Sequence, residues 1–184
     1  MVDKSVKQLG RDDWLRAALQ MCEQGIDQVR VARLAEKIGI TTGSFYWHFK
    51  NRQDLLDALL DYWERELTDV AIESTRKADV PPLERILLLM ETVMLGNMGR
   101  YDLPIWAWAQ SDSNARRVFN RVLKKRFAFA TSMFKEAGFS GEEAAARGRL
   151  MVSCMMAEST LVRDKEARSR KAIRLKHAIL TKHD

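Results

Sequence analysis

Two short helical stretches separated by Gly39 constrain this chain most strongly. Before the glycine, Val31, Leu34 and Ile38 recur at helical spacing. Glycine is the usual residue at which a helix ends in the left-handed conformation. The polar-fronted stretch that follows, residues 41–50, could form a helix of only about ten residues, which is marginal in isolation. A helix, a glycine turn and a second short helix form a helix-turn-helix, which neighbouring helices must hold in place.

The rest of the chain follows the same helical period, and Gly, Pro or capping residues mark where its segments end. We expect helices over about residues 11–24, 31–38, 42–49, 51–72, 82–95, 102–109, 113–137 and 141–162, and a last one from about Ala172 to Leu180. No stretch shows the sustained alternation typical of strands. The pattern therefore predicts an all-α fold of about nine helices. A three-helix helix-turn-helix head would occupy residues 1–52 and a helical-bundle C-terminal domain residues 53–184.

Composition places the chain among folded globular proteins, because 46% of its 184 residues are hydrophobic and 30% are charged. The net charge is +6, and it is unevenly distributed: +2 in residues 1–50, −6 in residues 51–114 and +10 in residues 115–184. A basic chain is compatible with nucleic-acid binding. The largest basic excess lies outside the predicted head, so charge alone is weak support for that function.

Several features favour a cytoplasmic protein without a membrane partner. The longest apolar runs are far shorter than the ~20 residues that a membrane span needs. The first residues lack the apolar stretch of a signal peptide, and residues 1–8 are expected to form a loose polar arm. Cys22 and Cys154 both fall on apolar helical patterns, which predicts two reduced core residues.

The residues around the helix-turn-helix resemble the head of a TetR-type transcriptional regulator. The resemblance covers about residues 10–60 and rests on Val31–Ile40, on Gly43–Arg52 with its Phe-Tyr-Trp-His-Phe-Lys run, and on Leu55 and Leu56. It implies an all-helical homodimer whose heads bind a palindromic operator. The divergent C-terminal bodies of such proteins hold a small-molecule effector and the dimer interface.

The resemblance, together with side-chain chemistry, assigns the DNA contacts to one set of residues: Arg30, Arg33, Thr41, Thr42, Gly43, Ser44, Tyr46, Trp47, His48 and Lys50. Hydroxyl, aromatic and imidazole groups can reach base edges or phosphates, and Lys50 supplies a cation for the backbone. Thr41 is expected to cap the second helix, while Arg30 stands where the family often has a capping Ser or Thr. Core packing remains the alternative for Tyr46 and Trp47, as does a structural hydrogen bond for His48.

The C-terminal part is rich in large, adaptable side chains, which are common in ligand pockets. The predicted effector pocket comprises Met90, Met94, Trp106, Phe127, Met133, Met151, Met155 and Glu158. Ordinary core packing is the alternative for the apolar members of this set. For Glu158 the alternative is an ion pair with an arginine of a second copy.

The last two helices, residues 141–162 and the basic helix around 172–180, are expected to form the dimer interface as a four-helix bundle. The basic run from Arg163 to Lys176 is most simply a solvated face beside that bundle. The sequence contains neither zinc-ligand spacing nor a nucleotide-binding glycine loop or nucleophile elbow.

We therefore expect a ligand-responsive repressor that needs no cofactor or metal and has no enzymatic activity. A ligand-independent architectural DNA-binding protein is the first alternative. A helical enzyme or ligand carrier is the second, and the absence of a catalytic constellation disfavours it.

Overall fold

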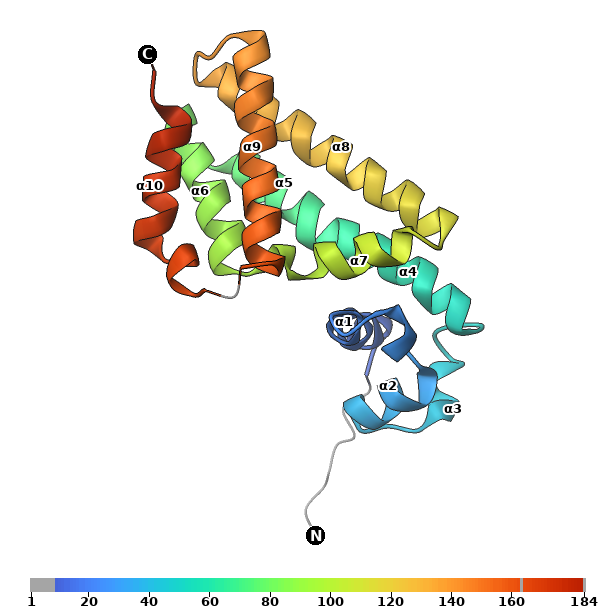
Figure 1. Ribbon diagram of the computed structural model, residues 1–184. Coiled ribbons are helices and arrows are strands. Elements are labelled where there is room, and N and C mark those ends of the chain that lie inside the picture. Colours follow the sequence, from blue (N-terminus) through green and yellow to red (C-terminus); the bar gives the residue numbers. More distant parts are fainter. Residues whose placement is uncertain (1–8, 163, 184) are drawn as a thin grey trace.

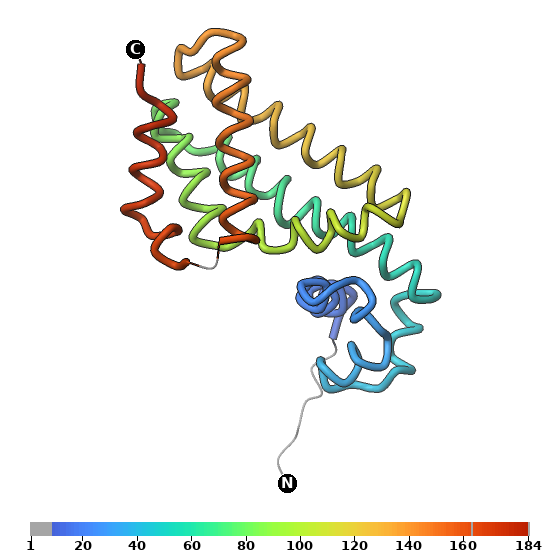
Figure 2. Tube along the Cα trace, in the orientation of Figure 1, coloured from blue at the N-terminus to red at the C-terminus, as the bar shows by residue number. Residues whose placement is uncertain are grey.

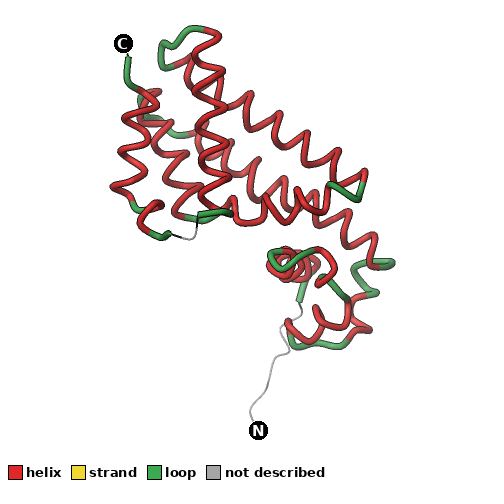
Figure 3. The backbone as a smooth tube through the Cα atoms, viewed as in Figure 1, coloured by secondary structure: helices red, strands yellow, loops and turns green. Residues whose placement is uncertain are grey.

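The structure is a computed structural model that describes residues 9–162 and 164–183. Its described part consists of helices and connecting loops, with no strand (Figure 3). The first elements are α1(Arg11–Cys22), η1(Ile26–Gln28), α2(Val31–Ile38) and α3(Thr42–Phe45). The others are α4(Arg52–Glu64), η2(Arg65–Asp69), α5(Val70–Lys77), α6(Pro82–Leu95), η3(Met98–Tyr101), α7(Asp102–Ala109), α8(Ser113–Glu136), α9(Gly141–Thr160), η4(Glu166–Arg168) and α10(Arg170–Thr181). We call α1 to α3 the head and α4 to α10 the body (Figure 1). The all-α prediction is confirmed.

One long rod joins the two parts. α4 continues through η2 into α5 without leaving the helical conformation, and η2 is a π-helical segment. The rod starts beside the head and runs into the body (Figure 2). The described part contains ten α-helices, and counting α4 and α5 as one helix gives the nine expected from the sequence. Single π turns within α-helices occur frequently at functional sites.

The helix-turn-helix has the expected layout, but its second helix is shorter than predicted. Gly39 ends α2 in the left-handed conformation, with φ 74° and ψ 32°. α3 was expected to reach Phe49, yet its regular part ends at Phe45. The next residues form tight turns in which each amide N–H, such as that of His48, bonds the carbonyl three residues back. The chain tightens here because Phe49 must enter the core shortly before α4 begins at Arg52.

The helix caps follow the sequence signals except at α3. The Asn51 side chain accepts from the backbone N–H of Asp54 at 2.9 Å, as expected for the start of α4. Ser140 likewise accepts from the N–H of Glu143 at the start of α9. Thr41 occupies the N-cap position of α3 but makes no side-chain cap bond. Its hydroxyl lies 3.3 Å from the Ser44 hydroxyl instead, so the predicted cap is wrong.

Two groups of buried side chains hold the body together. One runs from the head along α4 to α7 and α8, and stacks the Trp63 ring on that of Phe119 at 6.1 Å. The other lies among α5, α6, α8, α9 and α10. α8 and α9 pack closely at Gly148, where an added Cβ would lie 2.9 Å from the backbone nitrogen of Thr131. The first group contains residues of both predicted domains, and the boundary at residues 52 and 53 stays a prediction.

No helix in the described part of the chain combines the length and the apolar character needed to cross a bilayer. Of the two cysteines, Cys22 is a buried core residue as predicted, and burial raises the pKa of its thiol to about 12. Cys154 is only half-buried, and both thiols are free. The expected N-terminal arm, residues 1–8, and Arg163 of the basic run lie outside the described residues.

Candidate functional site

Aromatic packing fixes the position of α3. Phe45 and Phe49 are both fully buried, and their rings stack with centroids 5.3 Å apart. The Trp14 ring of α1 meets Phe45 edge-on at 5.4 Å. Edge-to-face and offset aromatic pairs add about 0.5–1.5 kcal/mol beyond the area they bury. A short helix that would not persist alone is thereby held against α1.

The opposite side of α3 and its turn is open to solvent. Tyr46 is 66% exposed and Trp47 is 87% exposed, although both are large and mainly apolar. The core alternative for these two residues therefore does not apply in this structure. Thr42 and Gly43 are also exposed, and Ser44, His48 and Lys50 complete the stretch at its edge and exit. We call residues 41–50 the exposed α3 face.

The arginines around this face have different structural roles. Arg30 carries no cap bond and donates its Nε to the carbonyl of Asp27 at 3.0 Å. Arg33 is exposed and donates to the side chain of Gln28. Arg52 holds the loop before α2 against α4, since its Nε bonds the Val29 carbonyl at 2.7 Å and its Nη2 the Ile26 carbonyl at 2.8 Å. In the sequence, the position of Arg52 directly after the Asn51 cap does not indicate this long-range contact.

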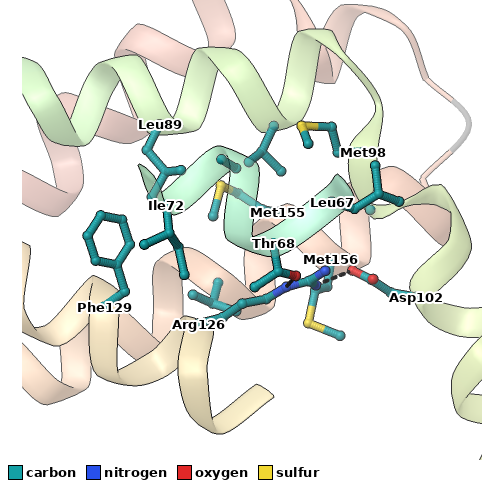
Figure 4. A pocket seen from close by; sticks show the side chains of 14 residues that line it. Leu67, Thr68, Ile72, Leu89, Met98, Asp102, Arg126, Phe129, Met155 and Met156 are labelled. Carbon is teal, nitrogen blue, oxygen red and sulfur yellow. Dashed lines mark hydrogen bonds and ion pairs between the residues drawn. The ribbon is translucent and has the colours of Figure 1, made fainter. Parts of the chain in front are cut away.

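A second candidate site is a cavity of about 50 Å³ inside the body (Figure 4). Its walls come from η2, α5, α6, η3, α7, α8 and α9. The lining residues are Leu67, Thr68, Ala71, Ile72, Leu89, Val93, Met98, Gly99, Asp102, Arg126, Phe129, Val152, Met155 and Met156. Apolar side chains dominate this wall, and three polar ones gather at one end of it, as in ordinary ligand sites.

The polar end of the cavity is a buried ion pair. Arg126 Nη1 lies 2.8 Å from Asp102 Oδ2, and Arg126 Nε donates to the Thr68 hydroxyl at 3.0 Å. The guanidinium also lies 5.4 Å from the centroid of the Trp63 ring. Burial raises the pKa of Asp102, although the Arg126 guanidinium and the Trp63 indole N–H oppose that rise. The described residues leave Asp102 Oδ1 without a hydrogen-bond partner.

The predicted pocket residues are dispersed, and only Met155 lines this cavity. Met90, Met94, Met133 and Met151 are buried in the core. Sequence periodicity identified them as buried, but a buried side chain can face another helix as readily as a cavity.

The other three predicted pocket residues lie elsewhere in the body. Trp106 and Phe127 line a shallow groove on the outer side of α7, α8 and α9. Glu158 pairs with Lys176 at 2.5 Å and lies 3.6 Å from the Cys154 sulfur. Glu158 was expected to line the pocket, but its ion pair is made within the chain and differs also from the alternative of an arginine of a second copy.

The cavity wall is connected to the head by two routes. Leu67 and Thr68 belong to η2, the π-helical part of the rod that reaches the head. Met98 and Gly99 belong to η3, and the next residue, Arg100, pairs with Glu23 after α1 at 2.9 Å. The cavity wall is therefore in contact with the head along the rod and through this ion pair.

The described residues contain no cluster of three or more metal-ligating side chains. The acid Glu91, buried within an apolar stretch, pairs with Arg170 at 3.2 Å and Arg174 at 3.8 Å.

Comparison with known proteins agrees with the geometry of the head. The sequence profile of the family described as "Bacterial regulatory proteins, tetR family" matches residues 15–59. The HTH-type transcriptional regulator TtgR of Pseudomonas putida is 29% identical over 111 residues, which are 60% of this chain and 47% of that protein. The tetracycline repressor protein class D of Escherichia coli is 46% identical over 52 residues, 28% of this chain and 24% of the repressor. Residues 15–59 therefore match the model of the tetR family, and the chain is similar to regulators of that family. These relatives are transcriptional regulators, not enzymes.

The TetR fold extends over the whole described chain. A TetR transcriptional regulator from Legionella pneumophila superposes with a TM-score of 0.74, covering 97% of each chain at 12% identity. Identity at that level shows the fold alone. The match to TtgR spans about half of that relative's length, and the strong identity to the tetracycline repressor is confined to a segment of 52 residues. The match to the family therefore rests on the head, and the likeness of the body is one of fold.

Proposed function

We propose that this TetR-family chain is a transcriptional repressor that binds a palindromic operator as a homodimer and releases it when a small molecule binds the body. The observation that carries the DNA-binding part is the exposed α3 face. An 87% exposed tryptophan stands beside a 66% exposed tyrosine, whose ring meets that of Phe45 edge-on at 5.3 Å. Exposed apolar groups of this size mark interaction sites. Phosphate and base contacts use hydroxyl, aromatic and cationic groups such as these.

The proposed contacts follow the geometry of a helix-turn-helix. Thr41, Thr42, Gly43, Ser44, Tyr46, Trp47, His48 and Lys50 would face the groove or its phosphates, with Arg30 and Arg33 beside them. The two copies of α3 would be separated by one DNA turn, about 34–36 Å, in the binding-competent dimer. The face lacks Arg, Asn and Gln, the side chains that grip a base with two hydrogen bonds. Sequence selectivity would then depend on apolar contacts, Arg33 and DNA shape.

The test uses DNA that the wild-type protein selects from a random pool. Tyr46→Ala together with Lys50→Ala should abolish binding in a gel-shift assay while the oligomeric state stays unchanged. Lys77→Ala, which removes an exposed cation at the end of α5, is the matched control and should bind normally. Unchanged binding by the double variant would overturn the assignment of this face. The single variant Lys50→Ala should weaken binding to all sequences and flatten the salt dependence.

The dimer interface is proposed on α9 and α10. Leu150 on α9, Leu161 directly after it, and Leu175 and Ile179 on α10 are each about two-thirds exposed. Large apolar side chains on the surfaces of both helices support a covered face in the dimer. Leu175→Glu with Ile179→Glu should convert the dimer to a monomer in light scattering after gel filtration. Val70→Glu, at a half-exposed apolar position on α5, is the control, and a dimer that survives the double change would exclude α10 from the interface.

The ligand-responsive part is supported by the cavity and its two routes to the head. A ligand shifts the conformational equilibrium only by its differential affinity for the two states. The alternative is a ligand-independent architectural DNA binder, which the small size of the cavity favours. Operator binding that no metabolite extract alters would favour that alternative. Release by an extract fraction would support the repressor.

A further inference from the structure

The polar end of the body cavity has features that restrict what the cavity can bind. Arg126 and Asp102 approach to 2.8 Å, and their side chains are 15% and 2% exposed. The positive and negative charges compensate each other, so the pair presents no net charge to an occupant. Transferring an isolated ionised group from water into such a site is costly unless a partner compensates it. A charged ligand would have to compete with one member of the pair for the other.

The same pair still has unused hydrogen-bonding capacity. Asp102 Oδ2 accepts from Arg126, whereas Oδ1 and the Trp63 indole N–H are both buried and neither makes a hydrogen bond of normal geometry among the described residues. Arg126 uses Nε for Thr68 and Nη1 for Asp102, whereas a guanidinium carries five N–H donors. The pair can therefore accept one hydrogen bond and donate another. A hydroxyl group matches both requirements, because it has one O–H donor and two acceptor lone pairs.

The remainder of the wall limits the size and polarity of the occupant. The cavity of about 50 Å³ is far smaller than the roughly 300–1,000 Å³ of sites for drug-sized ligands. Three methionines, Met98, Met155 and Met156, line it, and methionine side chains adapt readily to a new shape. Leu89, Ile72 and Phe129 close the end away from the ion pair (Figure 4). A single ring or a short branched chain would fit after modest methionine rearrangement.

We propose that the body cavity binds a small, uncharged, mainly apolar molecule with one hydroxyl group, of the phenol or cyclic-alcohol class. The hydroxyl lies at the Arg126–Asp102 pair and the hydrocarbon part among Met98, Met155 and Met156. This inference rests on the proposed function, because it names the chemistry of the proposed effector site. It differs from that proposal in making a statement about binding that needs no DNA.

The test compares four probes that share one ring: phenol, toluene, benzoate and benzylamine. The wild-type protein carries labelled methionine methyl groups and is titrated by NMR at neutral pH, where benzoate and benzylamine are both ionised. Phenol should shift the methyls of Met98, Met155 and Met156 and bind at least tenfold more tightly than toluene, a difference of about 1.4 kcal/mol. Benzoate and benzylamine should bind at least tenfold more weakly than phenol. Equal affinity for phenol and toluene, or tighter binding of either charged probe, overturns the proposal, as does the absence of these methyl shifts.

A variant at Asp102 should reverse the preference for phenol over benzoate. Asp102→Asn keeps an oxygen for Arg126 but leaves the site with a net positive charge, so benzoate should overtake phenol. Glu91→Gln is the matched control, because the Glu91 side chain is also paired and only 18% exposed but lies outside the cavity wall. In that variant the wild-type order should persist. Circular dichroism checks that each variant is folded, and the wild-type order alone decides the question if Asp102→Asn does not fold.

The outcomes separate this inference from the proposed repressor. The wild-type probe order without any effect on operator binding would support the hydroxyl site and contradict ligand control through the cavity. Operator release by a compound that leaves all three methionine methyls unshifted, together with no preference for phenol, would overturn the hydroxyl site and leave ligand control standing.

Discussion

The head and the body of this chain organise their functional groups in opposite ways. In the head, two buried phenylalanines fix a short segment whose neighbouring side chains, Tyr46 and Trp47, point into solvent. In the body, the candidate site is internal, and its wall is assembled from seven helical elements. The head can be interpreted from ten consecutive residues. The body requires contacts such as Thr68 with Arg126, which are 58 positions apart.

The largest expected difference lies within the head itself, between Phe45 and Trp47. Phe45→Ala should lower the free energy of unfolding by about 3–5 kcal/mol, because it leaves a cavity beside Trp14. Trp47→Ala should change it by no more than about 0.5 kcal/mol, because the ring is almost fully exposed. Urea unfolding measures both values, and a gel-shift assay should show weakened operator binding for Trp47→Ala. Comparable destabilisation by the two changes would contradict the separation of core and exposed face.

A medium effect is expected at Glu64 in the body. Its nearly buried carboxylate bonds Arg121 and Lys125, while both cations remain partly exposed. Burial raises the pKa of Glu64, but hydrogen bonds and charge from Arg121 and Lys125 outweigh it, and the net pKa lies below the ordinary value. Stability from this pair is therefore present above the unfolded pKa of about 4.3 and is lost as pH falls through the lower folded pKa.

Replacing the Glu64 carboxylate tests the predicted direction of this pH dependence of stability. Glu64→Gln should cost about 1–2 kcal/mol at neutral pH, after allowance for the exposure of the two cations. It should also flatten the fall of stability with acid, as measured by urea unfolding at a series of pH values. Glu36→Gln, an exposed acid on α2 of the head, should leave the pH profile unchanged. If the free energy of unfolding fell equally steeply with acid in Glu64→Gln and in the wild type, the ion pairs of Glu64 would contribute nothing to the acid sensitivity.

The smallest expected effect concerns the contact between the two parts. Arg100 Nε lies 2.9 Å from Glu23, but the two side chains are 35% and 41% exposed. A double-mutant cycle with Glu23→Gln and Arg100→Gln should give a coupling energy below about 1 kcal/mol. Arg100→Gln alone should cost more than Glu23→Gln, because Arg100 also donates to the carbonyl of Asn97 and to the Tyr101 hydroxyl. A coupling well above that range would make this contact a major determinant of how the head sits on the body.

The head could be predicted almost completely from the sequence, and the failures are instructive. The Gly39 turn, the Asn51 cap and the inward direction of Phe45 and Phe49 depend on local conformation and spacing, which a sequence displays directly. Two features of the head were predicted wrongly: α3 ends earlier than expected, and the Thr41 side chain makes no capping hydrogen bond. Both depend on how close α4 must come to the head core, which is a tertiary distance.

The cavity could not be predicted in the same way. Met90, Met94, Met133 and Met151 were correctly expected to be buried, but they face the core between helices. Asp102 and Arg126 were not recognised at all. Asp102 stood in the sequence as a helix-starting residue before Pro104, and Arg126 as one of many basic residues on α8. Their role depends on the packing of α7 against α8.

The sequence by itself determined that this chain is helical, where its helices begin and end, and which stretch of the head carries side chains chemically suited to DNA. Each of these follows from the helical repeat and from local capping chemistry. Only the tertiary structure decided which buried side chains surround a cavity and which form a filled core. It also placed the π turn of the rod and the Arg126–Asp102 pair at that cavity. Helical periodicity tells which side of a helix is buried, but the partner across the interface is set by the packing of all helices together.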